Sequence, residues 1–338
     1  MMDTITNEQL KRILAYSALI IFGLFIVVEL RQFITPFLGA VIFYVMFKNM
    51  MNDLVQKRKW KAPLAAALVM LLSFFIIIIP VIVLSYMLYS KIVIVINDPA
   101  SLLSLLDLFD KKVFEFTGVE IFTSENMTAI KTNAGKLIPS MLGQTFWIVG
   151  SIVMMYFMLY FMLIKSDRLT TEVNAILPFE IENIQMFSRE LEAITLSNAI
   201  GVPLISLAQG IAAGLGYWLL GVNEPVFWGA ITAFVAFIPF VGTALIWVPT
   251  SIFLITMGDN WQGIILAIYC LAVVVNIDTV ARFMIQKKFA NVHPIVTVFG
   301  VIVGLNLFGL PGLIFGPLML SYFIISIKLY RKVYHTTE

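Results

Sequence analysis

Asp278 and Arg282 lie four residues apart near the end of an otherwise apolar run that contains "GIILAIYCLAVVV" (263–275). An aspartate followed by an arginine at this spacing can form an ion pair along one helix, in the favourable order. A carboxylate inside a bilayer is costly unless it has a partner, and intramembrane ionisable residues usually serve transport. One interpretation is therefore a polar gate or a proton or substrate site, to which Asn276 on a nearby turn adds an amide.

A structural role is the alternative interpretation of this pair. Arginine side chains near a helix end can extend to the lipid headgroups, and Asp278 would then merely neutralise Arg282. Both interpretations stay open at the level of the sequence.

The composition places these residues in a membrane. Of the 338 residues, 60% are apolar and 12% are charged, and the mean hydropathy is +0.97. A spanning helix needs about 20 mostly apolar residues, and such runs recur along this chain. The sequence predicts an all-α polytopic membrane protein whose six full spans are 13–31, 33–47, 62–88, 143–164, 197–220 and 262–283.

Two further apolar stretches, 226–257 and 294–327, are interrupted by proline and glycine. The loop 48–61 carries five Lys or Arg residues against one Asp, which predicts that it is cytoplasmic and that both termini are too. Each interrupted stretch must then return to the face from which it entered. Arms of about 15 residues reach only about 22 Å, so the sequence predicts two re-entrant hairpins, broken at 238–242 and 308–312.

The two hairpins would enter from opposite faces, which suggests an inverted repeat of 197–257 and 262–327. A shift of 68 residues aligns Pro249 with Pro317, among other pairs. Inverted repeats with broken helices near the bilayer midplane are typical of secondary transporters. The sequence predicts four divisions. They are a three-helix region that could support oligomerisation (1–88), an extracytoplasmic amphipathic segment (89–142), a fourth span with a cytoplasmic helix (143–196) and a transport region (197–338).

Glycine, proline and amide side chains complete the candidate site. The patterns "GIAAG" (210–214) and "GVIVG" (300–304) predict close helix packing. Two prolines close together after the second break instead predict unwound backbone that could bind substrate. Lone amides in apolar surroundings are more often interhelical hydrogen bonds than ligands. The candidates are Pro239, Gly242, Gly309, Pro311, Gly312, Gly316, Pro317, Gln209 and Asn306.

The segments "AFIPFVGTALIWVP" (236–249), "NIDTVARFMIQKKFANVHPIV" (276–296) and "GLNLFGLPGLIFGP" (304–317) carry a resemblance over almost the whole chain. In their order and spacing they resemble the autoinducer-2 exporter family of bacterial inner-membrane proteins. One departure is Phe283, where many relatives have a proline directly after the arginine. The matching residues are Pro239 with Gly242, Asp278 with Arg282, Lys287 and Lys288 with His293 and Pro294, and Gly304, Gly309, Gly312, Gly316 and Pro317.

The resemblance implies export of a small signalling molecule, as in quorum sensing, or of a metabolite, by alternating access. Some relatives resemble cation or proton antiporters, so a proton or sodium ion is an implied coupling partner. The resemblance also implies a homo-oligomer, with a pentamer as one arrangement. A membrane scaffold or channel-like assembly is the remaining alternative. Proline-broken hairpins near a buried acid favour the transporter.

Other classes of function find little support in the residues. One cysteine, Cys270, and two histidines cannot form a disulfide framework or a Cys/His metal site. The sequence has no phosphate-binding loop, metalloprotease or serine-hydrolase motif. We therefore expect no enzyme activity, no catalytic residue, no cofactor and no metal. Scattered positive charge predicts no nucleic-acid partner, which leaves lipid and a small-molecule substrate.

Overall fold

The computed structural model describes residues 7–97, 111, 114, 148–176, 180–238, 241–288 and 294–334, and for some helix residues the backbone only. These residues form helices and contain no strand. The helices are α1 (Asn7–Leu30), α2 (Ile34–Asn52), α3 (Ala62–Asn97), a helix over Ile148–Ile164, α6 (Ser166–Ile176), α7 (Ile181–Leu196), α8 (Val202–Leu219), α9 (Pro225–Val235), α10 (Ala244–Met257), α11 (Asn260–Tyr269), α12 (Val275–Lys288), α13 (Pro294–Phe308) and α14 (Gly312–Tyr334).

Four helical stretches in the described part of the chain are long and apolar enough to cross a membrane. They are Lys11–Lys57, Ala62–Tyr89, Ile181–Leu219 and Asn260–Ala281. A fifth arises if Ile148–Ile164 and Ser166–Glu172, which are bent by 86°, count as one span. The predicted spans 13–31 and 33–47 thus belong to one helical path, joined by a 3₁₀ turn at Arg31–Phe33. Pro36 does not interrupt it because it lies in the first turn of α2, where proline is tolerated.

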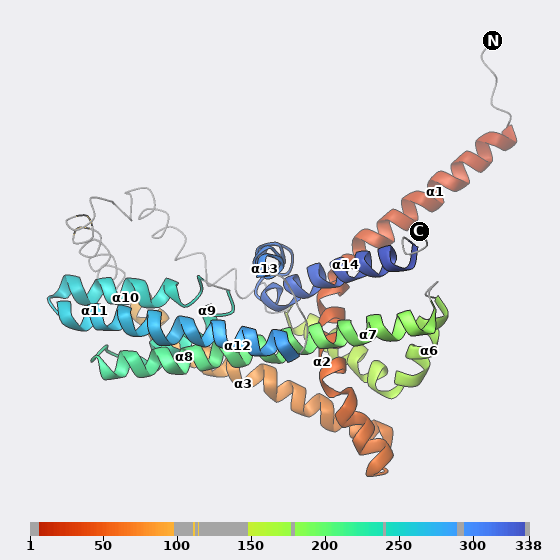
Figure 1. The fold of residues 1–338 in the computed structure, drawn as a ribbon. Coiled ribbons are helices and arrows are strands. Elements are labelled where there is room, and N and C mark those ends of the chain that lie inside the picture. The colour runs from red at the N-terminus through yellow and green to blue at the C-terminus, as the bar shows by residue number, and fades with distance from the viewer. Residues whose placement is uncertain are drawn as a thin grey trace.

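Helices α8 to α12 lie side by side as one block, and α1 extends outward at the opposite end of the molecule (Figure 1). Both predicted breaks are present, between α9 and α10 and between α13 and α14. Gly309 takes a φ of +64° at the second break, and Gly258 takes +105° after α10. Glycine reaches this left-handed region without steric cost, so it ends each helix cleanly.

Three apolar clusters hold these helices together. The first joins α2, α3 and the helix over Ile148–Ile164, and the second joins α8, α10 and α11. The third ties α14 to α2 and α7 through side chains that include Ile42, Ile194 and Leu318. The second hairpin is therefore anchored on α2 and α7, whereas the first hairpin packs inside the block of α8 to α12.

Glycines set the closest helix contacts in both halves. A Cβ on Gly210 would lie 2.6 Å from the Gly229 carbonyl oxygen, which confirms the predicted packing role of the "GIAAG" pattern between α8 and α9. In the second hairpin, a Cβ on Gly304 would lie 2.1 Å from the Gly312 oxygen, and one on Gly316 would lie 1.9 Å from the Gly300 oxygen. Helices α13 and α14 therefore meet backbone to backbone.

The prediction of unwound backbone after the second break is wrong. Helix α14 begins at Gly312 and continues through Pro317 to Tyr334. Gly312 and Gly316 face α13 in this helix, and the backbone of Pro317 would lie 2.5 Å from a Cβ on Gly300. The proline lies in the second turn of α14, and its small-residue neighbours make close packing, rather than an open loop, the stable arrangement.

A polar cluster links α2 to the helices that lead into α8. Lys48 forms an ion pair with Glu192 of α7, with side chains 30% and 25% exposed. The Tyr44 hydroxyl lies 2.6 Å from the Ser166 hydroxyl, and Thr195 shares a hydrogen bond with Tyr322 of α14. The Tyr44–Ser166 contact joins α2 to α6, and the other two join α2 and α14 to α7.

We expect Lys48→Glu to lower the free energy of unfolding by about 1 kcal/mol, because it places two carboxylates together at a half-buried position. The double reversal with Glu192→Lys should recover most of the loss. Thermal unfolding in detergent measures both. The matched control is Arg168→Glu in the more exposed Arg168–Glu172 pair, which should change stability by less. A double reversal as unstable as Lys48→Glu would contradict the pairing.

Candidate functional site

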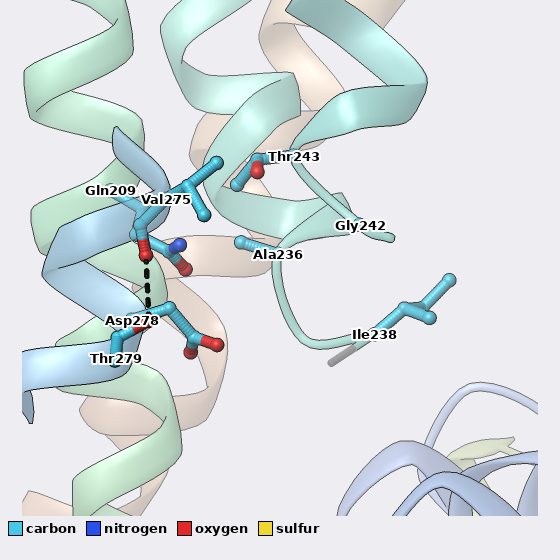
Figure 2. A pocket seen from close by; sticks show the side chains of 8 residues that line it. All are labelled: Gln209, Ala236, Ile238, Gly242, Thr243, Val275, Asp278 and Thr279. Atoms are coloured by element: carbon cyan, nitrogen blue, oxygen red, sulfur yellow. Dashed lines mark hydrogen bonds between the residues drawn. The ribbon is translucent and has the colours of Figure 1, made fainter. Parts of the chain in front are cut away.

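A small pocket lies where the tip of the α9–α10 hairpin meets α8 and α12. Its volume is about 50 Å³, and Figure 2 shows the carboxylate of Asp278 directed into the space beside the tip. Asp278 is 8% exposed. The lining residues are Gln209, Ala236, Ile238, Gly242, Thr243, Val275, Asp278 and Thr279.

The helix that carries Asp278 is widened just before it. Residues Cys270–Val274 form a π-helical segment between α11 and α12, closed by the Val275 amide donating to the Cys270 carbonyl. Single π turns inside α-helices often occur at functional sites because they displace the residues that follow. Here the segment precedes the first turn of α12, which contains Asp278. The extra residue in this turn changes the direction in which the side chains that follow it, including that of Asp278, project from the helix.

Two side-chain amides support this π segment. The Gln209 amide donates to the Val274 carbonyl at 3.1 Å, which joins α8 to the segment. The Asn276 amide donates to the Leu271 and Ala272 carbonyls at 3.2 and 2.8 Å. Backbone carbonyls in an apolar interior need donors, so both amides stabilise the widened turn. Gln209 thus forms an interhelical hydrogen bond, as predicted for a lone amide in apolar surroundings. It also lines the pocket.

Gly242 shapes the hairpin tip. Its amide donates to the Ile238 carbonyl at 3.0 Å, which closes the turn between α9 and α10. A Cβ here would lie 2.1 Å from the Val235 oxygen and 2.5 Å from the Ile238 oxygen. Only glycine fits this backbone, because any other residue would overlap two carbonyl groups. The pocket wall formed by 236–238 depends on that turn.

The structure brings Asp278, Gln209 and Gly242 together and places other predicted residues elsewhere. Asn276 is exposed and its amide serves its own helix, so the expectation that it adds an amide to the Asp278 site is wrong. Asn306 is also exposed and donates to Ile302 of its own helix at 3.0 Å, rather than to a neighbouring helix. An exposed side-chain amide in a helix can donate its hydrogen bond to a backbone carbonyl one turn earlier.

The second hairpin does not contribute to this pocket. All the lining residues belong to α8, α12 or the α9–α10 hairpin. Gly309 and Pro311 lie in the exposed turn before α14, and Gly312, Gly316 and Pro317 are buried in the contact with α13.

Some predictions fall wholly or partly outside the described residues. Pro239 is one, and most of the amphipathic segment 89–142 is another. Arg282 lies on the α12 backbone, one helical turn after Asp278, but its side chain is among those not described.

Five lining residues were not among the sequence candidates: the apolar Ala236, Ile238 and Val275, and the two threonines. Thr243 directly follows Gly242 and is 5% exposed, and Thr279 follows Asp278 and donates to the Val275 carbonyl at 3.4 Å. Their positions next to predicted residues were an available signal. The π segment had none, since "CLAVV" reads as ordinary apolar helix.

The pocket is lined by one carboxylate, one amide and two hydroxyl side chains, from Asp278, Gln209, Thr243 and Thr279. Oxygen atoms of these kinds are the ligands that hard cations prefer. Small-molecule sites have volumes of about 300–1,000 Å³, so a site of this size admits water or an ion rather than a metabolite. Within the described residues, no group of three or more His, Cys, Asp or Glu side chains could hold a metal ion.

The chain belongs to the AI-2E family of transporters, whose family model matches residues 14–332. It is therefore a multi-pass membrane protein of a transporter family, which implies transport rather than enzyme activity. A provisionally named transport protein of Mycobacterium tuberculosis is 22% identical across 99% of this chain and 90% of that protein. One from Aquifex aeolicus is 30% identical over 52% of this chain, and the matched part spans about half of that protein's length, 49%.

Proposed function

We propose that this chain is a secondary transporter that exports a small signalling molecule or metabolite, with Asp278 as the ion- or proton-binding group of its cycle. The observation that carries the proposal is a buried carboxylate on α12 that faces the tip of a broken helical hairpin. Discontinuous helices meeting at an ionisable group are how secondary transporters build coupling sites inside the bilayer. A scaffold would gain nothing from a buried acid that faces such a tip.

The size of the pocket supports a division of roles within the cycle. A cavity of about 50 Å³ holds an ion or a few waters, whereas a metabolite needs several times that volume. The substrate would therefore bind when the hairpin tip moves away from α8 and α12. Uptake or loss of a cation at Asp278 would bias that movement. A cation or proton antiporter is the second candidate, because the pocket already suits the ion.

The finer topology belongs to the same proposal. Both hairpins would be re-entrant from opposite faces, with the termini in the cytoplasm and the family's bacterial inner membrane as the location. The close contacts between pairs of glycines do not follow the predicted inverted repeat, since they join α8 to α9 in the first half and α13 to α14 in the second. If the two halves are related by an inverted repeat, they share the order of their helices but not their glycine contacts. A homo-oligomer is part of the same proposal, in which the exposed apolar surface of α1 would face lipid or a second copy of the chain.

Flux in proteoliposomes tests the proposal. We expect at least one solute from a panel of small hydroxylated metabolites to move faster when a proton or a sodium gradient is imposed. Collapsing the gradient with an ionophore should remove the effect. Flux that is equal with and without both gradients would favour the channel-like alternative. No flux of any solute or ion by folded protein would favour the scaffold.

A further inference from the structure

Helix α10 buries two polar atoms that have no hydrogen-bond partner among the described residues. They are the indole Nε1 of Trp247 and the hydroxyl Oγ of Ser251, on side chains 7% and 3% exposed. Leaving a buried donor unsatisfied costs about 1–3 kcal/mol, and more where lipid surrounds the protein. Each such group in a folded protein needs an explanation.

The two residues continue the pocket along one face of α10. Thr243 lines the pocket, and its carbonyl accepts the Trp247 amide at 3.1 Å, so Thr243, Trp247 and Ser251 follow one another at intervals of one turn. At 1.5 Å per residue they lie about 6 and 12 Å from Thr243 along the helix. The row leads from the Asp278 pocket toward the open end of the hairpin at Gly258.

This row faces protein rather than lipid. Trp247 belongs to the apolar cluster that includes Leu266, Cys270 and Val274. The backbone at Ser251 meets Gly263 of α11, whose Cβ would lie 2.6 Å from the Ser251 oxygen. The two polar atoms therefore lie between the packed helices α8 to α12 and not against lipid.

We propose that Thr243, Trp247 and Ser251 line the exit path from the Asp278 pocket, and that Trp247 Nε1 and Ser251 Oγ bind oxygen atoms passing along it. An indole N–H only donates, so the passing group must be an acceptor: the oxygen of a water molecule or of a hydroxylated solute. A cation cannot bind to Trp247 Nε1. The inference rests on the proposed function. It assigns to α10 the part of the transport path that leads away from the Asp278 pocket.

A purely structural explanation makes a different prediction. If both groups were only imperfect packing, Trp247→Phe and Ser251→Ala would remove unsatisfied polar atoms and leave transport unchanged. Ser321 of α14 supplies the matched control, because its hydroxyl is also buried and unpartnered among the described residues but lies outside this row. If the path exists, Trp247→Phe and Ser251→Ala should be as stable as Ser321→Ala. Gradient-driven flux should fall severalfold in these two variants and stay unchanged in Ser321→Ala.

Thiol reactivity tests the path without knowledge of the substrate. Ser251→Cys and Ser321→Cys are each placed on a Cys270→Ala background and treated in proteoliposomes with Ag⁺, which is water-sized, or with 2-sulfonatoethyl methanethiosulfonate, which is solute-sized. We expect Ser251→Cys to react with Ag⁺ roughly tenfold faster than Ser321→Cys, a ratio equivalent to about 1.4 kcal/mol. Reaction with Ag⁺ alone identifies a water path, and reaction with both probes identifies a solute path.

Equal rates at the two positions, or no reaction at Ser251→Cys, would overturn the path. Trp247→Phe and Ser251→Ala with wild-type flux would overturn it as well, even if Ser251→Cys proved unstable. These failures are distinct from failure of the proposed function, because gradient-driven flux by the wild-type protein is measured separately.

Discussion

Asp278→Asn should abolish gradient-driven flux while the protein still folds, and adding Arg282→Gln should not restore transport. The reason is that an asparagine amide keeps the shape of the buried side chain but can neither take up a proton nor neutralise a cation. Asp278 is 8% exposed and lines the pocket with Gln209 and Gly242, so a neutral side chain fits the site. The cycle would lose its coupling group and keep its architecture.

The structural interpretation of the pair predicts the opposite pattern. If Asp278 served only to neutralise Arg282, Asp278→Asn would leave an uncompensated charge in the bilayer, at a cost of about 3–5 kcal/mol. The double variant with Arg282→Gln would then replace the ion pair by two neutral polar groups and recover both stability and flux.

Flux in proteoliposomes and thermal unfolding in detergent, measured from mildly acidic to mildly basic pH, separate the two interpretations. Asp259→Asn is the matched control, because it makes the same change at an exposed position just before α11 and should keep wild-type flux. Near wild-type flux in the double variant would reduce Asp278 and Arg282 to architecture and remove the coupling site.

The sequence predicted those parts of the structure that depend on local backbone chemistry. Proline and glycine at 238–242 and 308–312 marked both helix breaks, because these residues act on the chain where they occur. The "GIAAG" pattern marked a close helix contact for the same kind of reason, since small residues at one-turn spacing leave room for another backbone. Asp278 stood out because a charge in an apolar run is unusual.

Other features depend on tertiary surroundings and had no such signal. The π segment at Cys270–Val274 is stabilised by Gln209 from another helix, so nothing within the segment itself reveals it. Pro317 was expected to unwind the backbone, but α14 tolerates it because α13 packs against that turn. The same residue type opens the chain in one place and remains helical in another, and packing decides between them.

Gly242→Ala should lower the free energy of unfolding by about 1–3 kcal/mol and also reduce flux. A Cβ at this position would lie 2.1 Å from the Val235 oxygen and 2.5 Å from the Ile238 oxygen. Both are backbone atoms of the same tight turn, so no flexible side chain can move aside to relieve the overlap. The turn must open, which weakens the bond from the Gly242 amide to the Ile238 carbonyl.

Opening this turn would move Ala236 and Ile238 away from Asp278, so the variant should lose the shape of the pocket as well as stability. Gly150→Ala is the matched control: it lies in the helix over Ile148–Ile164 with nothing within 4 Å of its added Cβ. Because alanine is the better helix former by up to about 1 kcal/mol, the control should be as stable as the wild type or more so. Thermal unfolding and gradient-driven flux are measured for both variants. If Gly242→Ala matched Gly150→Ala in both measurements, the tight turn at the hairpin tip would not be what shapes the pocket.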